Sequence, residues 1–206
     1  MVTKIKVYME GGGKDKNGKA MLREGMTKFL EKATASSSGR FQVTCCGSRN
    51  EALNMFRTAL ERPNENPDYI FLLVDSEAFV KDADDGFKRP KQHLQTRDPS
   101  WDMQSMNEKQ IHLMVQVMES WFVADPETLA NFYGQNFNRN AIPKNNIVEE
   151  IEKLKIETAL VEATKNTTKG KYHKIQHGAK ILAIINPNIV RGKALYCDRF
   201  LEAIDI

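Results

Sequence analysis

The stretch Tyr69–Val74 (YIFLLV) is continuously apolar, and it constrains the fold more than any other segment. A continuous apolar run of this length is typical of a strand that is covered on both faces. Two further short strands are predicted over Lys4–Met9 and Phe41–Cys45. Helical spacing separates these strands, so we expect an α/β fold, a parallel sheet connected by right-handed crossovers.

Helix signals occupy the segments around these strands. Ser48 and Glu51 stand three residues apart and form a capping box, which predicts a helix start. A fourth strand is expected near His112–Val117, followed at once by a helix through Trp121. We expect the ring of Trp121 to lie in the hydrophobic core.

The second half of the chain is helical in pattern. Asp125–Pro126 is an N-cap followed by proline at the first helical position, and helical spacing continues beyond Pro143. Residues 76–109 are polar and irregular, which favours a long functional loop. We therefore predict an α/β core over residues 1–134 and a basic helical extension, packed on that core, over residues 135–206.

Composition narrows the class of protein. Of 206 residues, 41% are hydrophobic and 28% charged, which is typical of globular chains. No apolar run approaches the roughly 20 residues that cross a bilayer, and acid and glycine interrupt the N-terminal segment at Glu10–Gly13. The three cysteines lack CxxC spacing. These features predict a reduced cytoplasmic protein without a disulfide framework or a zinc site.

Acidic residues follow two of the predicted strands directly. Glu10 comes after the first strand, and Asp75 and Glu77 come after the third. Ligands of open parallel sheets bind outside the carboxyl ends of the strands, and neighbouring strands lie only about 5 Å apart. Three carboxylates at one point repel each other unless a cation neutralises them. Because the ligands are all oxygens, the pattern favours Mg²⁺ or Mn²⁺.

Two alternatives stay open for these acids. Carboxylates at strand ends also cap the following helices, so each one can be structural. Glu10 is interpreted either as a further metal ligand or as a general acid/base. Glu119 is a further candidate catalytic residue, because a polar group inside the apolar run of residues 111–124 must be paired or functional.

Residues 163–197 contain seven basic residues and no acidic one, whereas the middle of the chain is acidic, with Asp82, Asp84 and Asp85. Such a segment suits a polyanion, and Tyr172 among the lysines suits stacking on a base. A solvated, lysine-rich helix face would have the same pattern. The candidate nucleic-acid contacts are Lys165, Lys169, Lys171, Lys174, Lys180, Arg191 and Lys193.

A nucleotide-binding interpretation competes with the metal centre. The segment Gly13–Lys19 fits the spacing G-x-x-x-x-G-K of a phosphate-binding loop. The next residue is Ala20, where a Ser or Thr hydroxyl should bind magnesium. A glycine- and lysine-rich turn that contacts a nucleic-acid backbone is the alternative.

These motifs resemble those of known families. Glu10 with the glycines that follow it, and LLVDSE (Leu72–Glu77), resemble a Toprim domain, the fold shared by primases, topoisomerases and overcoming-lysogenization-defect nucleases. The stretch MVQVMESWFVADPETLANFYG (Met114–Gly134) is similar to a bacterial family of small Toprim-like proteins of unknown function. It is distantly similar to the RloB family, which also carries a Glu shortly before a Trp.

The resemblance implies roles for individual residues. Glu10 matches the Toprim glutamate, and Asp75 and Glu77 match the two acids of the Asp-x-Asp motif. Glu77 departs from that motif, because its extra methylene moves the carboxylate outward. Such proteins are often found beside AAA/ABC-type ATPases in phage-defence loci, which implies an ATPase partner.

We therefore expect a Mg²⁺- or Mn²⁺-dependent Toprim-type nuclease that hydrolyses DNA or RNA, an effector of an ATPase-coupled defence system. The catalytic set would be Glu10, Asp75, Glu77 and Glu119, of which the first three would hold the metal. One alternative is a non-catalytic Toprim-fold adaptor that docks on an ATPase. Another is a P-loop-like phosphotransferase that uses Gly13–Lys19.

Overall fold

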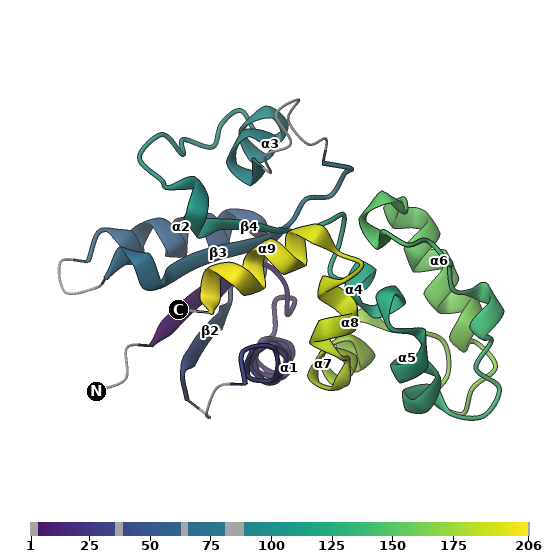
Figure 1. Cartoon of the computed structure of the whole chain (residues 1–206). Coiled ribbons are helices and arrows are strands. Elements are labelled where there is room, and N and C mark those ends of the chain that lie inside the picture. The colour runs from purple at the N-terminus through teal and green to yellow at the C-terminus, as the bar shows by residue number, and fades with distance from the viewer. Residues whose placement is uncertain (1–3, 36–38, 63–65, 81–88, 206) are drawn as a thin grey trace.

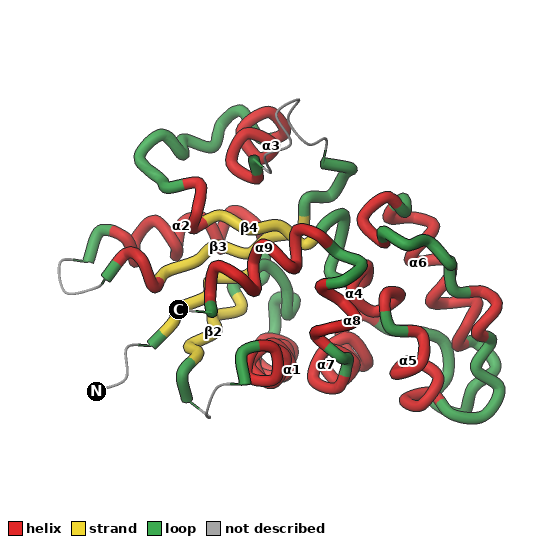
Figure 2. Tube along the Cα trace, viewed as in Figure 1, coloured by secondary structure: helices red, strands yellow, loops and turns green. Residues whose placement is uncertain are grey.

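The computed structural model describes residues 4–35, 39–62, 66–80 and 89–205. Its centre is a sheet of four parallel strands in the order β2-β1-β3-β4 (Figures 1 and 2). This confirms the predicted α/β class, a parallel sheet flanked by helices. The strands are β1 (Ile5–Met9), β2 (Phe41–Cys45), β3 (Ile70–Asp75) and β4 (Ile111–Met114).

Helices connect these strands and continue the chain after β4, as Figure 1 shows. Capping explains several of their starts, including the predicted capping box of Ser48 and Glu51 at the second helix. The helices are α1 (Lys16–Ala33), α2 (Arg49–Leu60), α3 (Pro90–Arg97), α4 (Glu119–Ala124), α5 (Pro126–Tyr133), α6 (Lys153–Thr164), α7 (Lys174–Ile184), α8 (Pro187–Arg191) and α9 (Leu195–Ile204).

Both faces of the sheet are covered, and β3 shows why its sequence is apolar throughout. All six of its residues are buried. Leu72 and Val74 pack in one apolar cluster with side chains of α2 and α3, and Leu73 packs in the other with α1. The sheet register pairs Met9 with Leu73 and Asp75 with Met114. The carboxyl ends of β1, β3 and β4 therefore lie at the same edge.

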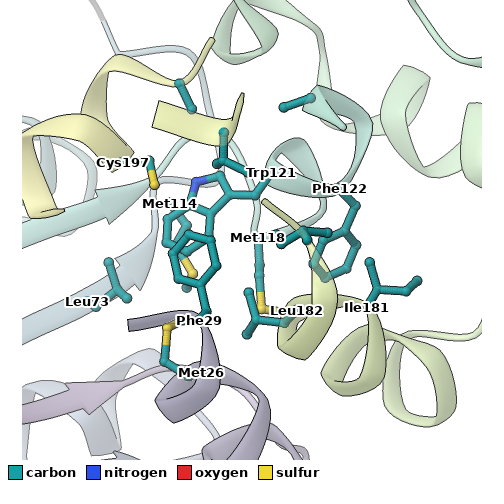
Figure 3. Close-up of a cluster of buried hydrophobic side chains, with 14 of the residues drawn as sticks. Met26, Phe29, Leu73, Met114, Met118, Trp121, Phe122, Ile181, Leu182 and Cys197 are labelled. Carbon is teal, nitrogen blue, oxygen red and sulfur yellow. The ribbon is translucent and has the colours of Figure 1, made fainter. Parts of the chain in front are cut away.

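The C-terminal helices share the main hydrophobic core with the sheet. Trp121 is fully buried and stacks on Phe29 of α1, with ring centroids 5.2 Å apart. Met118, which precedes α4, and Leu182, which belongs to α7, lie beside this pair in Figure 3. Phe200 of α9 belongs to the same cluster. The predicted place of Trp121 in the core is confirmed, and side chains of α7 and α9 share this core with α1 and the sheet.

Two details differ from the expectations drawn from the sequence. The segment predicted to be irregular contains α3, which begins at a proline in the first helical turn. The fourth strand ends at Met114 rather than Val117. Asp82, Asp84 and Asp85 lie outside the described residues.

Within the described ranges, no helix combines the length and the apolar composition that crossing a bilayer requires.

Candidate metal centre

Glu10, Asp75 and Glu77 meet at the carboxyl edge of the sheet, as the strand pattern predicts. Glu10 follows β1 directly, and Asp75 is the last residue of β3. One carboxylate oxygen from each of the three residues lies within 4.8 Å of the others. The backbone N–H of Asp75 donates to Glu10 Oε2 at 3.2 Å, which ties the two strand ends together. The structure therefore brings this predicted trio to one point.

Glu77 reaches the cluster through an uncommon backbone conformation. Its φ is 61°, in the left-handed region that side chains seldom adopt, and its N–H donates to the carbonyl of Gln116 at 2.8 Å. Strained backbone of this kind often marks functional sites. This turn places the Glu77 carboxylate in the cluster, although Glu77 lies two residues after the end of β3.

Burial and mutual repulsion disfavour the charged forms of these acids. Asp75 is 4% exposed, and burial raises its pKa well above the ordinary value. The Glu10, Glu119 and Glu77 carboxylates raise it further, against the opposing effect of Lys174. Burial also raises the pKa of Glu10, opposed by the Asp75 N–H and by Arg49. A divalent cation among these oxygens would offset both effects.

Basic side chains surround the acids, and each is the first residue of a helix. Lys174 of α7 lies 3.8 Å from Asp75 Oδ2, and Lys153 of α6 donates to Glu77 Oε2 at 2.6 Å. Arg49 of α2 has its Nε 3.8 Å from Glu10 Oε2. A cation at a helix N-terminus opposes the helix dipole, so these positions favour contact with the acids over helix stability.

Glu119, the first residue of α4, lies behind the trio and not within it. It is 2% exposed, and its Oε1 accepts a hydrogen bond from the Tyr172 hydroxyl at 2.8 Å. Among the described residues, its Oε2 has no hydrogen-bond partner and lies 3.4 Å from Lys174 Nζ. The pKa of Lys174 is raised above its ordinary value: burial lowers it, but the Glu119 and Asp75 carboxylates more than offset that effect.

The basic segment is spread over several elements. Within the described part of the chain, Lys174 is the one candidate of the seven that forms an ion pair with an acid of the trio. Lys193 Nζ instead donates to the Ala124 carbonyl at 3.0 Å. Lys169 lies over the ring of Phe132, 5.4 Å from its centroid. Lys165 pairs with Glu162, Arg191 pairs with Asp198, and Lys171 and Lys180 are exposed.

Tyr172 points inward to Glu119, and burial raises its pKa well above the ordinary value. Its ring also meets Phe122 edge-on, with centroids 6.4 Å apart. These contacts have a physical reason, because a buried hydroxyl needs a partner and Glu119 supplies one. Stacking of this tyrosine on a base stays a prediction.

The loop Gly13–Lys19 forms a helix start rather than a phosphate cradle. The Asp15 side chain accepts from Gly18 N at 2.8 Å and caps α1. Lys19 Nζ donates to the Cys46 carbonyl at 3.0 Å. A carboxylate therefore already accepts from one of the helix N-terminal amides that would bind a phosphate, which argues against a phosphate-binding loop here.

Three polar residues at this site were not among the candidates from the sequence: Arg49, Lys153 and Gln116. Arg49 is held by Asp98 at 2.7 Å, and its guanidinium lies 5.2 Å from the centre of the Trp101 ring. The signal in the sequence for Arg49 and Lys153 was weak, namely a basic residue at the start of a predicted helix.

A cavity of about 410 Å³ opens beside the acids. The loop after β1 and helix α7 line it from two sides, and buried side chains of α1 and of the segment around α4 line its floor. Its lining residues are Glu10, Gly11, Gly12, Gly13, Gly18, Leu22, Gly47, Asp75, Met114, Met118, His173, Lys174, Ile175 and Ala179.

The family model for a domain of unknown function (DUF4276) matches residues 9–205. This range includes the acidic cluster, the cavity and the C-terminal helices. No curated protein matches the chain, and no solved structure matches it. Because the match covers nearly the whole sequence, the chain belongs to the DUF4276 family.

Proposed function

We propose that this protein is a Mg²⁺- or Mn²⁺-dependent phosphodiesterase that hydrolyses nucleic acid. The observation that carries the proposal is the convergence of Glu10, Asp75 and Glu77 within 4.8 Å at the carboxyl edge of the sheet. The donors are all carboxylate oxygens, as these cations prefer. The resemblance of the same residues to the Toprim motif supports the same assignment.

The donor set fits a small divalent cation. The pKa of Asp75 and that of Glu10 are raised by burial, so the site holds ionised acids more easily when a cation shares it. Glu10, Asp75 and Glu77 would hold the ion. When bound, such an ion supplies Lewis-acid polarisation of a phosphate oxygen and an activated water.

The chain's own residues orient and balance this site. Asp75 Oδ1 accepts from the Met118 N–H at 2.9 Å, which fixes the carboxylate. Lys153 fixes Glu77 in the same way. Lys174 keeps its proton, because Glu119 and Asp75 raise its pKa against the effect of burial. Its ammonium lines the cavity, where it would bind a phosphate oxygen.

Glu10 is the candidate for proton transfer. Its side chain is 18% exposed and lines the cavity, so it reaches solvent and substrate while Asp75 stays buried. This role is the alternative to metal binding by Glu10: where Asp75 and Glu77 alone hold the ion, the raised pKa of Glu10 brings its carboxylate closer to the range in which a general acid/base works. An ATPase partner and a role in phage defence stay expectations from the family resemblance.

The test is cleavage of labelled single-stranded and duplex DNA and RNA with and without Mg²⁺ or Mn²⁺. Asp75→Asn keeps the size of the side chain and an acceptor for Met118, and it should lower the rate about a thousandfold. Asp125→Asn is the control, because Asp125 is 1% exposed and accepts two backbone N–H bonds outside the cluster.

Retention of full activity in Asp75→Asn would refute the assignment. Absence of cleavage from the wild-type protein, under conditions in which it binds Mn²⁺, would instead favour the non-catalytic adaptor. Equal losses in Asp75→Asn and Asp125→Asn would show that the effect comes from folding.

A further inference from the structure

The cavity beside the acids is lined by two chemically different kinds of side chain. Glu10, Asp75 and Lys174 supply the charged groups. The remaining side chains are largely apolar, and most are buried, so they form a preformed wall: Leu22, Met114, Met118 and Ala179, with the half-exposed Ile175 at the rim. A site for phosphate alone would need no such wall.

Backbone forms the side of the cavity opposite α7. Gly11, Gly12 and Gly13 all have positive φ, and no hydrogen bond within the described residues uses the N–H of Gly12 or Gly13. A Cβ placed on Gly13 would lie 3.6 Å from Ile175 Cδ1. The loop and α7 therefore approach each other closely at this rim, and amide N–H groups without a partner among the described residues lie on the loop side.

The volume limits the occupant. About 410 Å³ is near the lower end of small-molecule sites, which span roughly 300–1,000 Å³. This space accommodates one nucleotide and not a base pair. In a duplex the base stays stacked and paired, so a base reaches such a pocket only when it is unpaired.

We infer that the cavity binds one unpaired nucleotide, with its phosphate at the acids and Lys174 and its base against the methionine- and leucine-lined wall. The substrate class is then single-stranded nucleic acid or an unpaired end. This inference rests on the proposed phosphodiesterase function and specifies its substrate. The free amides of Gly12 and Gly13 would meet polar edges of the nucleotide.

The test compares Ile175→Asn with Ile184→Asn. Both isoleucines belong to α7 and are similarly exposed, 45% and 46%, but only Ile175 lines the cavity. Binding of AMP, UMP and inorganic phosphate is measured by calorimetry with Mg²⁺ present. We expect Ile175→Asn to weaken nucleotide binding about tenfold and to leave phosphate binding unchanged. Ile184→Asn should change neither.

Cleavage completes the test. The wild-type protein should cleave a single-stranded oligonucleotide at least tenfold faster than a covalently closed duplex of the same sequence. Equal rates on both substrates, or equal nucleotide affinity in the two variants and the wild type, would overturn the inference and leave the phosphodiesterase intact. Nucleotide binding that depends on Ile175, without cleavage of any polymer, would support the pocket and refute the phosphodiesterase.

Discussion

Replacing Asp75 by Asn should stabilise the metal-free protein while abolishing its response to metal. Asp75 is buried, and carboxylate oxygens of Glu10 and Glu77 lie within 4.8 Å of one of its own. Asn keeps the volume and can still accept from the Met118 N–H. The variant therefore removes a buried charge and two repulsions at little cost in packing.

The magnitude follows from the distances. At an effective dielectric constant of about 20, two unit charges 4.8 Å apart repel by about 3.5 kcal/mol. The attraction to Lys174 at 3.8 Å is about 4 kcal/mol on the same scale, reduced because Lys174 is 52% exposed. Two repulsions exceed one weakened attraction by about 3 kcal/mol or more, which is the gain expected in Asn. For a chain of this size, about 3 kcal/mol corresponds to roughly 6–12 °C in Tm.

The effect depends on pH. The folded-state pKa values of Asp75 and Glu10 are raised above their ordinary values of 3.8 and 4.5. The contribution of these two groups to the stability of the folded protein is therefore fully present at a pH below their ordinary pKa values. It is lost as the pH rises through the raised pKa values. The Tm difference between Asp75→Asn and the wild type should be near zero at pH 4 and largest near pH 8.

Thermal unfolding followed by circular dichroism, with EDTA or with Mg²⁺, measures both effects. At a Mg²⁺ concentration 100 times the dissociation constant, the wild type should gain about 2.7 kcal/mol, and Asp75→Asn should gain none. An Asn variant that is less stable than the wild type at pH 8 without metal would refute the electrostatic reasoning. An unchanged Mg²⁺ response would refute the role of Asp75 as a ligand.

Two further predictions concern the basic residues. Lys174→Gln removes a cation that lies 3.8 Å from Asp75 and 3.4 Å from Glu119. Mn²⁺ should therefore bind about threefold tighter or more, as measured by calorimetry, while single-turnover cleavage slows. A loss of Mn²⁺ affinity would contradict this. Lys171→Glu with Lys180→Glu reverses two exposed charges of the basic segment, and the salt dependence of nucleic-acid binding should become shallower by about two units of slope. An unchanged slope would show that the segment does not contact phosphates.

The strand ends made the acidic cluster predictable. The carboxyl ends of neighbouring parallel strands lie at the same edge of the sheet. Because β1 and β3 are neighbours, Glu10 and Asp75 meet at that edge. The capping box at Ser48 was equally readable, because its signal is local. The capping box depends only on a short stretch of chain, whereas the acidic cluster also depends on the pairing of β1 with β3.

The cations around the cluster were not predictable in the same way. Arg49, Lys153 and Lys174 reach the acids because α2, α6 and α7 pack where they do, and no short-range pattern encodes that packing. The inward turn of Tyr172 has the same origin: its partner Glu119 stands 53 residues away in the sequence. Lysine content indicated a basic segment, but only the packing separates Lys174 from the other six.

The most direct test of the account is a crystal of the protein soaked with Mn²⁺ and measured for anomalous scattering. The account predicts a peak among Glu10, Asp75 and Glu77, at about 2.0–2.6 Å from oxygens of these carboxylates. An anomalous map with no peak at this edge of the sheet, in a crystal that takes up Mn²⁺ elsewhere, would contradict it.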